Sequence, residues 1–169
     1  MYGVFSGDSL NPALFSGAEV FGPAAKLRHL SAWQWRVLLS TPLVLLLTWV
    51  RLRTRGYGGT LAAAQPEQSA PLVAGEQVAL AREASYAMAA AIKYGPWRPK
   101  CLLRSLALGW YLGRRGLSFG VRLGVPNAES GSSAPASPEF SAHAWVEVGG
   151  TVVNDGEDVH DRYLPFADG

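Results

Sequence analysis

Near the C-terminus the chain reads EFSAHAWVEVGGTVVND, residues 139–155, and this stretch decides the fold class. Side chains alternate in character from Ala142 to Val148, which is typical of a strand with one face on the core. A Gly-Gly pair and a second apolar run follow, so the stretch predicts a tight β-hairpin. His143 lies near its start and Asp155 at its end, although a hairpin needs neither. The two residues therefore suggest a site.

Three helical patterns precede the hairpin. Residues 31–55 form an apolar run with Ser31 as the expected N-cap, and residues 75–95 and 98–116 carry apolar side chains at helical spacing. Residues 117–125 are predicted to form one more strand. Helices followed by three strands predict an α+β fold, in which the N-terminal helices pack on a small antiparallel sheet.

The chain has 169 residues, which is enough for one domain with its own hydrophobic core. We expect residues 31–169 to form this single domain, and residues 1–30 to be a poorly structured extension because they show no clear hydrophobic period. Residues 56–71 and 126–139 are rich in loop-forming residues and are predicted to be loops. Residues 156–169 are predicted to be a polar tail held down by aromatic side chains.

The charges nearly balance, with 15 Lys and Arg against 13 Asp and Glu, a net charge of +2. This excess is too small to indicate a protein that binds nucleic acid. The single Cys excludes an internal disulfide and a Cys-rich zinc site, and it fits a reducing, cytoplasmic setting. His29 and His160 have no partner at metal-ligand spacing, so we expect no metal and no cofactor. Residues 1–30 lack the pattern of a signal peptide.

Residues 31–55 also bear on localisation. The uncharged stretch between Arg36 and Arg51 is shorter than the about 20 residues of a spanning helix, and Pro42 is expected to kink it. We favour a buried or partner-binding helix over a membrane-surface helix, and both over a true span. The Trp-rich flanks and Arg-rich ends keep membrane-surface contact through residues 31–55 open as an alternative.

Cys101 is expected in the first turn of the helix at residues 98–116. N–H groups there are free and the helix dipole is positive, and both favour thiolate over thiol. The same N–H groups are suited to an oxyanion hole, and Lys100 adds a positive charge. The simpler interpretation of a lone Cys is a small buried hydrophobe. Arg104 and Ser105, one turn later, are expected to tie the helix to the sheet.

The length of the hairpin loop decides which side chain is expected to orient His143. A two-residue Gly149-Gly150 loop puts Asn154 on the same face as His143. A three-residue loop with a bulge at Gly150 places Asp155 directly opposite His143. An amide and a carboxylate can both orient an imidazole, but only the carboxylate also stabilises an imidazolium, so Asp155 is the better chemical choice.

Together the motifs resemble a known family. KCLLRSLALGWYLGRRGL, residues 100–117, followed by AHAWVEVGG and then ND, is similar to the stand-alone leader peptidase of lasso-peptide biosynthesis. That family belongs to the transglutaminase-like, papain-like group of cysteine enzymes. The resemblance covers about residues 31–166, and it implies a transglutaminase-like (papain-like) core. It also implies a Cys-His-Asp triad at Cys101, His143 and Asp155, with the nucleophile at a helix N-terminus.

The resemblance also implies a function, the removal of the leader from a ribosomally made precursor peptide before a macrolactam cyclase acts on the core. It implies a separate leader-recognition protein, because no such domain fits into residues 1–30. The macrolactam cyclase is a further expected partner. Two alternatives stay open. One is an acyl transferase of the same fold that acts on an amine, and the other is a non-catalytic peptide-binding module with an inert Cys.

Overall fold

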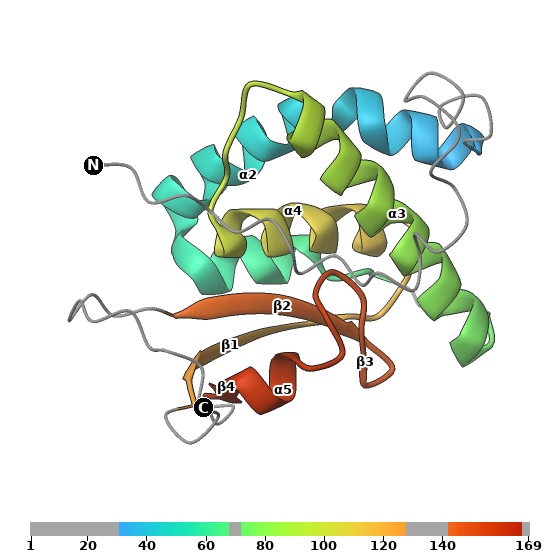
Figure 1. The fold of residues 1–169 in the computed structure, drawn as a ribbon. Coiled ribbons are helices and arrows are strands. Elements are labelled where there is room, and N and C mark those ends of the chain that lie inside the picture. Colours follow the sequence, from blue (N-terminus) through green and yellow to red (C-terminus); the bar gives the residue numbers. More distant parts are fainter. Residues whose placement is uncertain (1–30, 68–71, 128–141, 167–169) are drawn as a thin grey trace.

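A computed structural model of the chain describes residues 31–67, 72–127 and 142–166. Figure 1 shows helices gathered over a small curled sheet, so the predicted α+β class is confirmed. The predictions for residues 1–30 and for most of the 126–139 loop lie outside the described residues. The elements are α2 (Ala32–Ala64), α3 (Ala74–Tyr94), α4 (Cys101–Arg114), β1 (Gly120–Pro126), β2 (His143–Val148), β3 (Thr151–Val152), α5 (Val159–Arg162) and β4 (Tyr163–Pro165).

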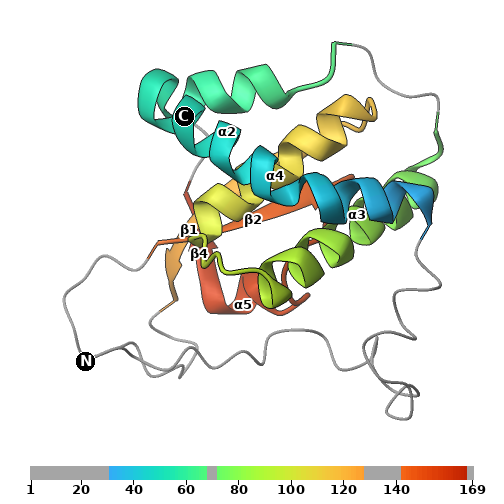
Figure 2. The same ribbon diagram turned by 90° about the horizontal axis from the view of Figure 1, so that it is seen from above.

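α4 is the central helix of the fold. Figures 1 and 2 show it directly over the sheet, with the other two long helices, α2 and α3, packed around it. Its buried side chains, such as Leu106 and Leu112, share one core with Val146 and Val148 of β2 and with Val37 of α2. A second, smaller core lies on the other face of the sheet, where Trp145, Val152 and Val159 pack with Tyr163. The alternation in β2 therefore separates two cores.

The sheet has four antiparallel strands in the order β3-β2-β1-β4. β1 pairs with β2 continuously, from Gly120 opposite Glu147 to Gly124 opposite His143. β3 pairs with the other edge of β2 at only two positions, the last of which is Glu147 opposite Val152. One edge of β2 is therefore paired with β1 along almost its whole length, whereas the other edge is paired with β3 only near the turn.

The hairpin between β2 and β3 closes with a two-residue turn. Gly149 and Gly150 have φ values of 56° and 79°. Two successive left-handed residues make a type I′ turn, which glycine enters without steric cost and which suits the twist of a hairpin. Val148 faces Thr151 across this turn, so the two-residue loop is the alternative that forms.

The start of α2 was predicted correctly, but its end was not. Ser31 forms a capping box with Gln34, since each side chain accepts the backbone N–H of the other residue. Residues 56–64 were predicted as part of a linker, yet α2 continues to Ala64. Helical angles persist through Pro42, and Gly56 alone departs from them inside α2 (φ 68°, ψ −172°).

The extra helical segment has a clear physical basis. Its last residues are Leu-Ala-Ala-Ala, which favour helix, and Thr60 and Ala64 are buried. Gly113 of α4 lets the backbone approach, because a Cβ there would lie 1.7 Å from the carbonyl oxygen of Ala64. Packing on α4 thus overrides the loop signal of the glycines at 56–59.

The fourth strand is the other departure from the prediction of three strands and a polar tail. β4 pairs with β1 at Gly124, Val125 and Pro126. Three residues that end in a proline are too few to show a strand period, which is why the sequence pattern did not predict β4. The aromatic contact expected for the tail exists, since Tyr163 packs in the smaller core.

Candidate active site

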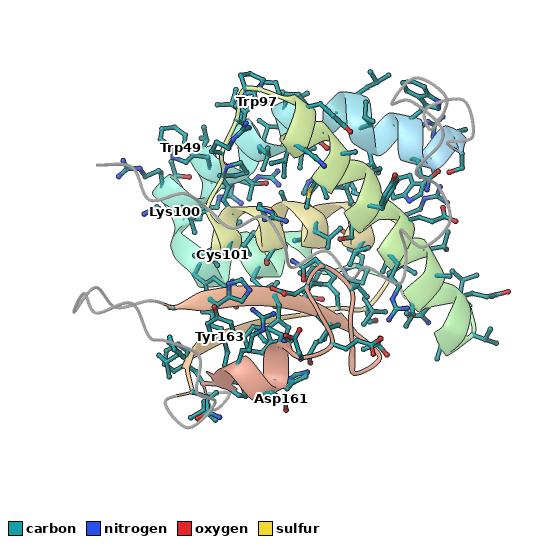
Figure 3. All side chains as sticks on the ribbon, viewed as in Figure 1. Trp49, Trp97, Lys100, Cys101, Asp161 and Tyr163 are labelled. Carbon is teal, nitrogen blue, oxygen red and sulfur yellow. The ribbon has the colours of Figure 1, made fainter. Side chains whose placement is uncertain are left out.

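Cys101 lies in the first turn of α4, as predicted, although the helix starts at Cys101 itself and not at residue 98. Lys100 is the N-cap, and its side chain makes no capping hydrogen bond. The side chain of Lys100 therefore leaves the N–H groups of the first turn free to donate to another group, at the positive end of the helix dipole. The Cys101 Sγ lies 3.8 Å from the carbonyl oxygen of Ala142, just before β2. Figure 3 shows Cys101 on the helix side of β2, with Tyr163 on the far side of the strand.

The surroundings of Cys101 favour the thiolate. A hydrogen bond to the His143 side chain is the largest cause that lowers the pKa of Cys101. Burial acts in the opposite direction, but the backbone N–H groups of Ala144 and Leu102 and the charge of His143 also lower this pKa. A thiol held in this way is more nucleophilic at neutral pH than an ordinary buried one.

His143 is the first residue of β2, and it bonds to Asp155 through Nε2 and the Oδ2 carboxylate oxygen. The ring of Tyr163 stacks on the imidazole with centroids 4.6 Å apart and planes 24° apart. Burial lowers the pKa of His143, but hydrogen bonds to Asp155 and Cys101 outweigh it and raise the pKa to about 9. The imidazole is therefore held as a cation between a thiolate and a carboxylate.

The second oxygen of Asp155 is also bound. Oδ1 accepts the N–H of Gly156 at 2.7 Å and an N–H of Arg162 at 3.0 Å. Burial raises the pKa of Asp155, but His143, the Gly156 N–H and Arg162 together hold it below its usual value. Arg162 pairs in turn with Asp158 at 2.8 Å, and a Cβ on Gly156 would lie 2.2 Å from an Asp158 oxygen. Both oxygens of the carboxylate are thus fixed.

Asn154 does not orient His143, although a two-residue turn was expected to place it on the same face. Its Oδ1 accepts the N–H of Val146 at 2.7 Å, and its Nδ2 donates to Ser105 Oγ at 3.1 Å. Ser105, which is fully buried, donates to the carbonyl of Ala144 at 3.0 Å. Asn154 and Ser105 therefore tie α4 to β2, which confirms the structural role expected for Ser105.

The same contacts explain why the turn length gave the wrong partner for His143. In a regular hairpin the Val146 N–H would bond to the carbonyl of Val153, whereas here the Asn154 side chain takes that N–H. The Val153 N–H still bonds to Val146 O at 3.0 Å. The regular pairing with β2 ends at this point, so the side chain of Asp155 no longer follows the alternation of the two strand faces. Asp155, and not Asn154, is the partner of His143 in the structure.

Sequence reasoning missed Arg162 and Tyr163, which hold Asp155 and His143 from α5 and β4. The spacing of four residues from Asp158 to Arg162 was a visible signal, because it suits an ion pair on one helical turn. Nothing in the sequence linked that turn to Asp155. A metal site was not expected, and among residues 31–67, 72–127 and 142–166 no three His, Cys, Asp or Glu side chains group as metal ligands.

Chemically, the site suits acyl transfer. A thiolate at a helix N-terminus is a nucleophile, a neighbouring imidazolium is a general acid, and free N–H groups can stabilise an oxyanion. Comparison with curated proteins and with solved structures gives no match. A family model described as the transglutaminase-like superfamily matches residues 38–168, a span that includes every side chain of this site. The chain therefore belongs to the transglutaminase-like superfamily.

Proposed function

We propose that this chain is a cysteine peptidase that removes the leader from a ribosomally synthesised lasso precursor peptide. It acts with a separate leader-recognition protein, before a cyclase closes the macrolactam. The observation that carries the proposal is Cys101 at an uncapped helix N-terminus beside an imidazole that Asp155 holds. Membership of the superfamily supports cysteine-dependent acyl chemistry. The motifs around Cys101 and His143 support the lasso precursor as the substrate.

The reaction has two halves. The Cys101 thiolate attacks the carbonyl carbon of the last leader residue, and first-turn N–H groups of α4 stabilise the oxyanion. The peptide C–N bond then breaks while the His143 imidazolium gives its proton to the departing amine, so the core leaves with a free N-terminus. Water, deprotonated by His143, hydrolyses the thioester and releases the leader as a carboxylate. Asp155 keeps the imidazole in place throughout.

The test is a cleavage assay with the precursor peptide and the leader-recognition protein. Wild-type chain should release leader and core in amounts that mass spectrometry detects. In water that carries a heavy oxygen isotope, one label should appear in the leader carboxylate. Cys101→Ala should release neither product, while Glu76→Gln, an exposed change in α3, should behave as wild type. Normal cleavage by Cys101→Ala would refute the proposal.

Acyl transfer to an amine is the second candidate, because the superfamily is transglutaminase-like. The acceptor of the acyl group separates the two activities. A transferase would join an added primary amine to the side-chain carbonyl of a glutamine. The glutamine C–N bond would break, and an isopeptide bond and ammonia would form. A third outcome, the non-catalytic binding module, requires an ordinary thiol, so Cys101 would then be alkylated with the pH dependence of free cysteine.

A further inference from the structure

The outer face of α2 is apolar although it has no partner within the described part of the chain. The inner face packs into the core, where Val37 and Val44 are buried. On the opposite face Leu39, Leu43 and Leu46 are 70%, 58% and 57% exposed. Burying leucines is favourable, and a contiguous apolar patch on a protein surface usually marks an interaction site.

The exposed side chains form one continuous stripe. They recur at steps of three and four residues, which places them on one side of a helix with 3.6 residues per turn. We call this stripe the outer face of α2, made of Trp35, Leu39, Leu43, Leu46, Trp49 and Val50. Figures 1 and 2 show the part of α2 before Gly56 on the opposite side of α4 from the sheet. The outer face therefore lies away from the sheet layer.

The charged side chains of α2 itself are all positive. No Asp or Glu occurs from Ser31 to Ala64, whereas Arg36 follows Trp35 at the start of the stripe, and Arg51, Arg53 and Arg55 follow its end. The guanidinium of Arg53 lies 5.6 Å from the ring centre of Trp49. Beyond the other end, Arg115, the C-cap of α4, lies 4.1 Å from the ring centre of Trp33.

We propose that the outer face of α2 docks onto the surface of an anionic lipid bilayer. In a helix that lies in the interface plane, the leucines and tryptophans of this face enter the boundary between headgroups and acyl chains, and the neighbouring arginines contact the anionic headgroups. The lack of acidic side chains in α2 favours anionic lipid over a partner with mixed surface charge. This inference does not depend on the proposed peptidase activity.

α2 lies on the bilayer and does not cross it. By length and composition α2 could span a membrane. However, its inner face contributes Val37, Val44 and Leu45 to the main core, together with α4 and β2. A crossing would take these side chains out of the core, whereas a helix in the interface plane uses only the outer face.

The experiment is co-sedimentation of the full chain with lipid vesicles. One set contains phosphatidylcholine alone, and the other contains phosphatidylcholine with about a quarter of phosphatidylglycerol. Wild-type chain should bind the anionic vesicles more tightly, and about 0.5 M NaCl should weaken this binding because salt screens the headgroup charge. Brominated lipid should quench the tryptophan fluorescence of the bound chain.

Two variants locate the contact. Leu39→Gln with Leu43→Gln and Leu46→Gln should lower the partition coefficient by at least about 100-fold, because three apolar side chains no longer enter the lipid. Arg36→Gln with Arg53→Gln should lower binding to anionic vesicles by about fivefold per arginine, with little change for neutral vesicles. The control is Val73→Gln with Tyr94→Gln, two residues that are 68% and 73% exposed outside α2, and it should bind as wild type.

Three results would overturn the proposal. Wild-type chain that stays in solution with both vesicle sets has no such surface. Leucine and arginine variants that both bind as wild type would place the lipid contact elsewhere. Light scattering that finds a wild-type dimer, and a monomer for the leucine variant, would assign the outer face to a second copy of the chain. The arginine variant changes only exposed or half-exposed residues, so it keeps the test valid even where the leucine variant does not fold.

Discussion

The two edges of β2 are built in different ways. On one edge β1 runs beside β2 from Glu147 to His143, and backbone pairs with backbone throughout. On the other edge β3 ends at Val152, and side chains take over. There the N–H of Val146 donates to the Asn154 side chain. The carbonyl of Ala144 accepts from Ser105, and the carbonyl of Ala142 lies next to the Cys101 sulfur.

This difference shows how the fold makes room for chemistry. A complete β3 would occupy the edge that α4 approaches, and Cys101 would have no place next to His143. Because Asn154 imitates a backbone carbonyl, β3 can stop without leaving the Val146 N–H unpaired. Because the regular pairing stops at Asn154, the following residue, Asp155, can turn towards His143. The candidate site therefore lies where the hydrogen-bond ladder between β2 and β3 is interrupted.

Among the residues that position Cys101 and His143, the largest expected effect comes from Asp155→Asn. The amide keeps the shape of the side chain but loses the charge that stabilises the imidazolium, and the tautomer of His143 is no longer fixed. We expect kcat/KM for leader cleavage to fall by about 10⁴-fold, as for other histidine bases that lose their carboxylate. Circular dichroism should show an intact fold. Activity within about tenfold of wild type would mean that Asp155 does not orient His143.

The next effect is the pH dependence, which both groups of the ion pair determine. The pKa of Cys101 is lowered, so the thiolate forms below the ordinary pH for cysteine. The pKa of His143 is raised to about 9, so the imidazolium persists until that pH. Activity should therefore rise with pH through the Cys101 pKa, form a plateau, and fall about tenfold per pH unit above about 9. An alkylation rate of Cys101 that rises only near the pKa of free cysteine would contradict this profile.

Asn154→Ala tests the end of the ladder itself. The change leaves the Val146 N–H without its acceptor and removes a donor to the buried Ser105. We expect the free energy of unfolding in urea to fall by about 2–4 kcal/mol. Asn154→Asp keeps the acceptor for Val146 and should recover about half of this loss. Unchanged stability of Asn154→Ala would show that Asn154 does not close this edge.

Much of the site could be predicted because local signals carried it. Cys101 followed from one Cys at a helix start, and the hairpin followed from alternation and a Gly-Gly pair. Ser31 as the N-cap of α2 was also visible locally. These features depend on neighbours within a few residues, where spacing and side-chain chemistry determine the structure.

The remaining features depend on contacts between distant segments. Counting residues across the hairpin assumes that a ladder continues, and it cannot show that the Asn154 side chain replaces a carbonyl. The helical segment before Ala64 needs the open position at Gly113. β4 and the Tyr163 ring take their places only once β1 and His143 are present. None of these contacts leaves a period in the sequence.

Arg162→Gln should have a smaller effect than Asp155→Asn, because Arg162 acts through the carboxylate. Oδ1 of Asp155 would keep the Gly156 N–H but lose the guanidinium. We expect kcat to fall about tenfold with little change in KM, the loss of one partly buried charged hydrogen bond. The matched control is Arg82→Gln, which breaks the exposed pair with Glu157 at 3.3 Å and should leave kcat unchanged. Equal rates for the two variants would mean that Arg162 has no positioning role.

The smallest effect is expected on the edge where the ladder is complete. Gly120 of β1 pairs opposite Glu147, and a Cβ there would meet no atom within 4 Å. Gly120→Ala should raise the free energy of unfolding by about 0.4–1 kcal/mol, since alanine restricts the unfolded chain. At Gly124 of the same strand a Cβ would lie 2.7 Å from the Leu164 carbonyl oxygen, so Gly124→Ala should destabilise the fold. Urea unfolding measures both values, and leader cleavage by Gly120→Ala should match wild type. A loss of activity in Gly120→Ala at unchanged stability would show that the chemistry also depends on the β1 edge of β2.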